Sequence, residues 1–149
     1  MRAVLTRVSE ASVRVGDEIV GAIGAGLLVL LGVARDDDER DARAIADKIL
    51  GLRIWEDEGG KMNLDIHQSG GSVLLISQFT LLGDARSGKR PSFIAAAPGE
   101  QAKSLYENVG TLLERGSLRV AYGRFGATMA VASVNDGPVT ILLDSRRLF

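Results

Sequence analysis

Cysteine is absent from this sequence of 149 residues, and histidine occurs only once. Without cysteine there can be no disulfide, thiolate nucleophile, iron–sulfur cluster or cysteine-ligated zinc. One histidine is too few for a histidine-rich metal site, and the sequence contains no Gly-x-Ser-x-Gly motif. His67 lies in a polar run, so we interpret it as a loop or hairpin residue, with a catalytic role as the alternative. We expect neither a metal ion nor a cofactor.

An excess of either charge and long apolar runs are also missing. The 18 basic and 19 acidic residues leave a formal net charge of -1, so no overall electrostatic field attracts nucleic acid. The charge balance does not exclude a small area of contact with nucleic acid. No stretch reaches the roughly 18 apolar residues of a membrane span, and the first residues lack the apolar centre of a signal peptide. We therefore expect a cytoplasmic protein without membrane contact.

What is present begins with strand patterns. Residues 3–8 and 12–15 alternate apolar and polar side chains, and a turn at Gly16 leads to a returning strand over 19–23. The aliphatic run 27–33 predicts a central strand. Arg7 is the exception in the first strand. We interpret it as a solvent-facing charge, and the alternative is that its donors hold the carbonyls of another segment.

Two amphipathic helices are expected. The acidic cluster 36–39 caps the first, whose apolar positions between Ala42 and Leu50 follow helical spacing. The alternative function of this cluster is metal binding, but helix capping is sufficient to explain its acidic residues. The second helix begins at Pro98 and ends at Gly116.

The stretch 72–82 is predicted to be a central strand, apolar on both faces, that turns polar at Ser77, Gln78 and Thr80. Buried hydroxyl and amide groups cost a few kcal/mol unless they are hydrogen-bonded. These side chains therefore either join a structural network, which the strand alone favours, or line a site. The loop that follows carries Arg86, Lys89 and Arg90. It is either a solvated connection or the chain's best segment for contacting phosphate.

Three further strands are expected over residues 117–122, 129–134 and 139–144, with Asn135-Asp136-Gly137-Pro138 as a turn between the last two. With no linker or repeat, the chain 1–149 predicts one α+β domain. We expect mostly antiparallel sheets, arranged as a barrel or sandwich, with two helices packed on them.

Two motifs together resemble the signature of the D-aminoacyl-tRNA deacylases. These are Ser77-Gln78-Phe79-Thr80-Leu81 and Asn135-Asp136-Gly137-Pro138-Val139-Thr140, and the similarity extends over essentially the whole chain. The resemblance implies a homodimer that hydrolyses the ester between a D-amino acid, or glycine, and the terminal ribose of tRNA. It also implies active sites at the subunit interface, where a cis Gly137-Pro138 pair from one subunit meets the catalytic stretch Ser77, Gln78, Phe79 and Thr80 of the other.

By the same resemblance, Met129 and Arg7 stand where the family has pocket-lining and motif-locking residues. Arg86, Lys89 and Arg90 are expected to contact the acceptor end of the tRNA. The hydroxyl and amide groups of the motifs do not readily accept a proton at neutral pH, so we expect the ribose 2′-hydroxyl to help activate water. Thr80 as a covalent nucleophile is the alternative.

Chiral selection needs rigid backbone, because a methyl-sized difference in an apolar pocket gives only about 1 to 3 kcal/mol of discrimination. We expect the carbonyls of Gly137 and Pro138 to bind the amino group and to turn an L side chain against the main chain. Two other functions stay open. One is an editing domain for mischarged L-aminoacyl-tRNA, and the other is a nucleic-acid-binding module without catalysis.

Overall fold

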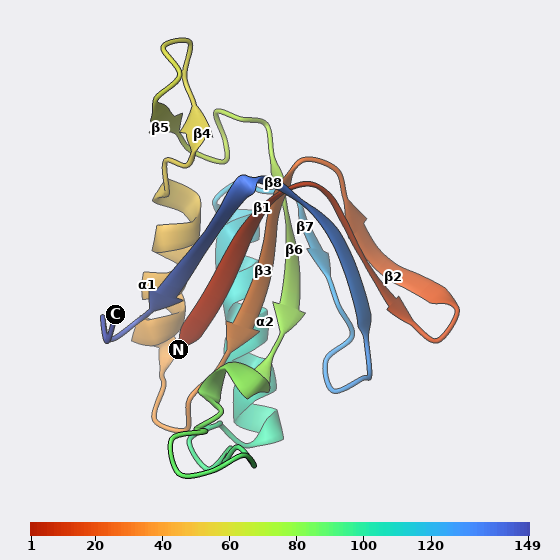
Figure 1. Ribbon diagram of the computed structural model, residues 1–149, viewed down its shortest axis with the longest axis vertical. Helices are drawn as coiled ribbons and strands as arrows, with labels where there is room; N and C mark the ends of the chain where they lie inside the picture. Colours follow the sequence, from red (N-terminus) through yellow and green to blue (C-terminus); the bar gives the residue numbers. More distant parts are fainter.

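The structure, a computed structural model, describes residues 1–149 as one curved six-stranded sheet with two α-helices packed on one face, beside a small two-stranded hairpin (Figure 1). The elements in chain order are β1 (Arg2–Val15), β2 (Glu18–Ile23), β3 (Gly26–Gly32), α1 (Glu39–Gly51), β4 (Trp55–Glu56), β5 (Met62–Leu64), β6 (Ser72–Ser77), the 3-10 helix η1 (Phe79–Leu82), α2 (Gly99–Arg115), β7 (Val120–Tyr122) and β8 (Ala130–Asp144).

The long strand β1 organises the sheet. Its first half pairs with β3 and its second half with β2, while β8 pairs along nearly its whole length on the other edge, all antiparallel. The pairing is mostly antiparallel, as predicted, but β3, β6 and β7 are parallel neighbours. The physical reason is the position of the helices. α1 lies between β3 and β6 and α2 between β6 and β7, and a helical crossover returns the chain in the parallel direction.

The sheet curls until its two ends nearly meet, which confirms the expected barrel-like shape. Strand β2 packs against β7 without forming a hydrogen-bonded pair with it. Gly21 permits this approach, since a Cβ there would lie 2.5 Å from the carbonyl oxygen of Tyr122. A glycine is therefore needed where the curled sheet closes.

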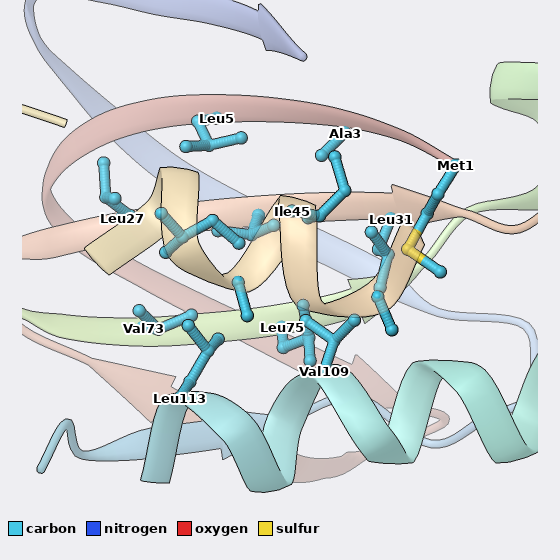
Figure 2. Close-up of a cluster of buried hydrophobic side chains, with 14 of the residues drawn as sticks. Met1, Ala3, Leu5, Leu27, Leu31, Ile45, Val73, Leu75, Val109 and Leu113 are labelled. Atoms are coloured by element: carbon cyan, nitrogen blue, oxygen red, sulfur yellow. The ribbon is translucent and has the colours of Figure 1, made fainter. Parts of the chain in front are cut away.

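The apolar core lies on both faces of the central strands. Val73 and Leu75 of β6 face the helices, whereas Leu74 and Ile76 face the inside of the curl, and all four are at most 1% exposed. This confirms the prediction of a strand covered on both sides. Figure 2 shows the helix side, where Ile45 of α1 and Val109 and Leu113 of α2 pack over the sheet.

The acidic cluster at the start of α1 caps the helix and holds the N-terminus. Asp38 accepts a hydrogen bond from the Arg40 amide at 2.8 Å, and it forms a capping box with Asp41, whose carboxylate accepts from the Asp38 amide at 2.9 Å. The buried carboxylate of Asp37 accepts from the Met1 amino group at 2.7 Å and from the Ala34 amide at 2.6 Å. These contacts account for the cluster.

The expected hairpin over residues 129–144 is wrong. β8 runs without interruption from Ala130 to Asp144, and the Asn135–Pro138 segment lies inside it. Its pairing with β1 shifts register on both sides of Val8, so local bulges absorb the irregular segment instead of a turn. Pro138 is tolerated because β8 is an edge strand, where one side of the backbone needs no partner.

The remaining strand and helix predictions differ only in their ends. β7 is shorter than predicted and covers Val120–Tyr122, and the second helix starts at Gly99 with Pro98 as its N-cap residue. Neither helix combines the length and apolarity that crossing a membrane requires.

Candidate active site

A pocket of about 370 Å³ opens where β6 ends. Strand β6 was predicted to continue to Leu82, but it stops at Ser77 and the chain turns into the 3-10 helix η1. The reason is the loss of a partner, since the pairing with β3 ends at Leu31 and Ser77. The pocket is lined by Val33, Ile76, Ser77, Gln78, Phe79, Ala97, Gly99, Ala102, Phe125, Gly126, Ala127, Met129 and Val131.

The pocket lies between two chain segments that diverge. β6 and β7 stay paired as far as Leu75 and Tyr122, and the Leu75 carbonyl accepts a hydrogen bond from the Gly123 amide at 3.0 Å. Beyond that point one segment becomes η1, and the other turns back through Gly126, whose φ is +76°. Met129 on this second segment lines the pocket.

The motif Ser77–Thr80 does not form one buried polar network. Ser77 and Gln78 are half-buried and line the pocket, whereas Phe79 and Thr80 are exposed on η1. The Gln78 side-chain amide donates to the Thr80 hydroxyl, and the Phe79 ring meets the Phe93 ring edge-on with centroids 5.1 Å apart. Thr80 itself is outside the pocket lining.

None of the lining residues carries an ionisable side chain, so the pocket contains no general base. His67 is exposed in a turn before β6, as interpreted from the sequence, and does not line the pocket. No group of three or more His, Cys, Asp or Glu side chains is placed to hold a metal ion. The chemistry available from the protein is therefore binding and polarisation by hydroxyl, amide and backbone groups.

The sequence did not predict part of the pocket lining. Gly99 and Ala102 come from the first turn of α2, and Ala97 precedes it. Small residues at a helix start carry no distinctive signal by themselves. Only their position directly after the basic loop that follows η1 connects them with the motif.

Arg7 is buried, so the solvent-facing interpretation is wrong and the alternative is correct. Its Nε donates to the Asp136 carbonyl at 3.1 Å, and Nη1 donates to the Ile54 carbonyl at 2.5 Å. The Asp136 carboxylate lies 3.3 Å from Nε and supplies the opposite charge. Because the guanidinium has several donors, Arg7 binds the Ile54 carbonyl just before the β4–β5 hairpin and the backbone next to Gly137 at the same time.

The Gly137–Pro138 peptide bond is cis, and Gly137 has a φ of +132°. Asn135 spans the segment, with its side-chain oxygen accepting from the Val139 amide at 3.1 Å and its nitrogen donating to the Thr140 hydroxyl at 3.3 Å. Both Gly137 and Pro138 are exposed. The backbone of this segment is thus held from both sides while its surface stays open.

Within one chain the two motifs do not meet. Val131 lines the pocket, and Gly137 lies six residues farther along the extended strand β8, which corresponds to roughly 20 Å at about 3.3 Å per residue. Neither Gly137 nor Pro138 is part of the lining.

The basic loop is closed by mutual backbone hydrogen bonds between Asp84 and Ser92 at 2.8 Å. The Arg86 guanidinium binds the Asp84 carboxylate at 2.6 Å, and this hydrogen bond holds the pKa of Asp84 well below its usual range. Lys89 and Arg90 are exposed and form no ion pair within the chain. Of the three residues predicted to contact phosphate, Lys89 and Arg90 are therefore available without breaking an ion pair.

Known proteins resemble this chain over its whole length. The sequence model described as D-Tyr-tRNA(Tyr) deacylase matches residues 4–144. The D-aminoacyl-tRNA deacylase of Anaeromyxobacter dehalogenans (strain 2CP-C) is 63% identical, and that of Thermotoga petrophila 58% identical, each over 100% of both chains.

Two solved structures share the fold. One, named "c-Myc DNA Unwinding Element Binding Protein", has a TM-score of 0.89 and 42% identity over 97% of this chain and 98% of its own. The other is a probable eukaryotic D-amino acid tRNA deacylase, with a TM-score of 0.82 and 15% identity over 95% and 97% of the two chains.

Proposed function

Since the chain belongs to the D-Tyr-tRNA(Tyr) deacylase family of hydrolases, we propose that it cleaves the ester between a D-amino acid, or glycine, and the terminal ribose of tRNA. The observation that carries the proposal is the pocket at the end of β6, where Ser77, Gln78 and Phe79 face Met129 without any ionisable group. The cytoplasm, where aminoacyl-tRNA is used, is the proposed location.

The reaction is substrate-assisted. A water molecule attacks the ester carbonyl carbon while the neighbouring ribose 2′-hydroxyl helps to take its proton, and the ester C–O bond breaks to release the ribose hydroxyl. The first amides of η1 have no acceptor inside that helix, so those of Phe79 and Thr80 are suited to stabilising the oxyanion. Thr80 is a weak nucleophile, because its hydroxyl is hydrogen-bonded to the Gln78 amide, which is no base.

Chiral selection comes from the Gly137-Pro138 segment of a second subunit. Its carbonyls bind the amino group of the substrate, and an L side chain then points into main chain that cannot yield. Glycine passes this test because it has no side chain to reject. Arg7 and Asn135 hold the backbone around the pair, which is what exclusion by a rigid backbone requires.

The second subunit is a second copy of the chain. The distance of roughly 20 Å between Gly137 and the pocket within one chain leaves the pocket without the selecting segment. β8 is a long edge strand whose apolar residues Val131 and Val134 are 39% and 51% exposed, as expected for a surface that pairs with another chain. A two-fold axis then places each motif at the pocket of the partner.

The tRNA acceptor end is bound mainly through Lys89 and Arg90, with Arg86 available once it leaves Asp84. So few phosphate contacts predict a weak salt dependence, in which the logarithm of the affinity falls with the logarithm of the salt concentration at a slope of about 2 to 4.

The test is to incubate the purified protein with the same tRNA carrying a D- or an L-amino acid and to follow release of the amino acid. Hydrolysis of the D ester alone supports the proposal, and hydrolysis of the L ester alone would make the protein an editing domain for mischarged L-aminoacyl-tRNA. The name of the structural relative that binds a DNA element favours one further candidate, nucleic-acid binding without hydrolysis. Binding of tRNA without release of either amino acid would support that candidate.

A further inference from the structure

Phe125 is shared by two pockets. It lines the active-site pocket of about 370 Å³ and also a second pocket of about 510 Å³ between α2 and the end of β7. The second pocket is lined by Lys103, Tyr106, Glu107, Thr111, Tyr122, Gly123, Arg124 and Phe125. Phe125 therefore forms part of the wall between two open spaces, and its position depends on the few groups that pack against it.

Tyr106 of α2 is one of these groups. Its side chain is 3% exposed, and its ring lies 5.8 Å from the Phe125 ring at an interplanar angle of 49°. Its hydroxyl donates to the Leu75 carbonyl at 2.8 Å, the same oxygen that accepts from the Gly123 amide. Leu75 stands two residues before Ser77, and Gly123 two residues before Phe125. The Tyr106 side chain thus makes two contacts. Its hydroxyl binds the backbone where the two pocket segments separate, and its ring packs against Phe125 in the wall between the pockets.

We propose that Tyr106 is a positioning residue for the reaction, which holds Phe125 as the wall of the active-site pocket and thereby fixes the width available to the aminoacylated end of the tRNA. The proposal rests on the proposed function. Tyr106 does not line the active-site pocket and acts only through Phe125 and Leu75. Burial raises the pKa of the Tyr106 hydroxyl, so the group stays a hydrogen-bond donor at neutral pH.

The test replaces the ring by an aliphatic side chain in Tyr106→Leu. The Michaelis constant for D-aminoacyl-tRNA is expected to rise about tenfold with kcat nearly unchanged, because a pocket wall binds the ground state and the transition state alike. Tyr122→Phe is the control for the loss of a tyrosine hydroxyl. It also removes a tyrosine hydroxyl, but that hydroxyl donates to Glu114 at 2.6 Å and not to Leu75.

A double-mutant cycle separates positioning from a general loss of stability. If Tyr106 acts through Phe125, the variant Tyr106→Leu/Phe125→Ala has the Michaelis constant of Phe125→Ala alone, because the wall is already gone. Multiplying effects of the two substitutions would mean that they act independently, and this outcome overturns the proposal.

A measurement without catalysis keeps this test separate from that of the proposed function. The NMR signal of the Met129 methyl group, which lies in the same pocket as Phe125, should shift or broaden in Tyr106→Leu and stay in place in Tyr122→Phe. An unchanged Met129 signal together with an unchanged Michaelis constant refutes the inference. A wild-type protein that hydrolyses no D-aminoacyl-tRNA refutes the proposed function instead. If the leucine variant does not fold, Tyr106→Met, which keeps apolar volume in a flexible side chain, replaces it.

Discussion

At the scale of single residues, the side chains that line the pocket predict which hydroxyl groups are needed for hydrolysis. Ser77→Ala and Thr80→Ala should each keep activity within about tenfold of the wild type, since neither hydroxyl is next to a base in the pocket. Replacing the 2′-hydroxyl of the terminal adenosine by hydrogen should reduce the rate on the order of 10²-fold or more, the usual contribution of general acid–base catalysis. Single-turnover hydrolysis of the paired substrates measures both effects.

His67→Ala serves as the control, because this exposed turn residue does not line the pocket and should be neutral. A covalent ester trapped on Thr80, or full activity on the 2′-deoxy substrate, would contradict substrate assistance.

Gly137 has no room for a side chain. A Cβ at this position would lie 2.7 Å from Cγ2 and 2.8 Å from the amide nitrogen of Val139, and the φ of +132° disfavours any L side chain. Gly137→Ala must therefore move the backbone that presents the carbonyls, and a displacement of about 1 Å at a reacting centre costs about 10²-fold in rate. We expect a folded variant whose kcat/KM for D-aminoacyl-tRNA falls by that order, with less discrimination against L substrates.

Gly60→Ala is a suitable comparison. Gly60 also has a positive φ of +74°, but no atom lies within 4 Å of the position that a Cβ would take, so backbone strain is present there without a clash. A Gly137→Ala variant as active and as selective as Gly60→Ala would contradict the proposed role of the segment.

At the scale of elements, the capping box makes α1 depend on Asp38. The Arg40 side chain binds the Asp38 carboxylate and lowers its pKa to about 2 from 3.8. Because the folded-state pKa is the lower one, the contribution to stability is present above about pH 3.8 and is lost as the pH falls toward 2. Asp38→Ala should lower Tm by a few degrees at pH 7, and by less near pH 2.

Thermal unfolding followed by circular dichroism at both pH values measures this difference. Asp38→Asn, which keeps an oxygen acceptor for the Arg40 amide, should lie between the wild type and the alanine variant. An equal effect of Asp38→Ala at both pH values would contradict the role of the carboxylate.

The same scale shows what the sequence predicted and what it did not. The sequence predicted nearly to the residue both amphipathic helices and the strands with strict alternation or continuous apolar runs, such as 27–33. In each of these segments the spacing of the apolar residues is typical of one kind of element. η1 was missed because Phe79–Leu82 continues the apolar run of β6, and only the end of the β3 pairing stops the strand. β8 was split because Asn135–Pro138 has the composition of a turn, and pairing with β1 overrides that local preference.

The candidate site follows the same division. The two motifs named the family correctly, but their composition could not place Thr80 outside the pocket or bury Arg7, since both facts depend on segments far away in the chain. Tertiary contacts decided these positions, and no local pattern records them.

At the scale of the whole molecule, the two motifs lie at separate places in one chain, so the proposed function predicts that activity depends on two chains. The prediction uses a pair of variants that are each inactive. Ala127→Trp fills the pocket and leaves the Gly137 segment intact, whereas Gly137→Ala does the reverse. Both change exposed or half-buried positions outside the helices, so both should fold and dimerise.

Mixing the two variants after subunit exchange should restore hydrolysis of D-aminoacyl-tRNA. A mixed dimer combines the open pocket of the Gly137→Ala chain with the intact segment of the Ala127→Trp chain, which makes one working site of two. Random exchange of equal amounts gives mixed dimers in about half of the population, so about a quarter of wild-type activity is expected for a two-fold symmetric assembly. Exchange is followed by mass spectrometry of differently labelled chains. Proven exchange without recovered activity would place the whole site within a single chain, and the exposed edge of β8 would then need a different explanation.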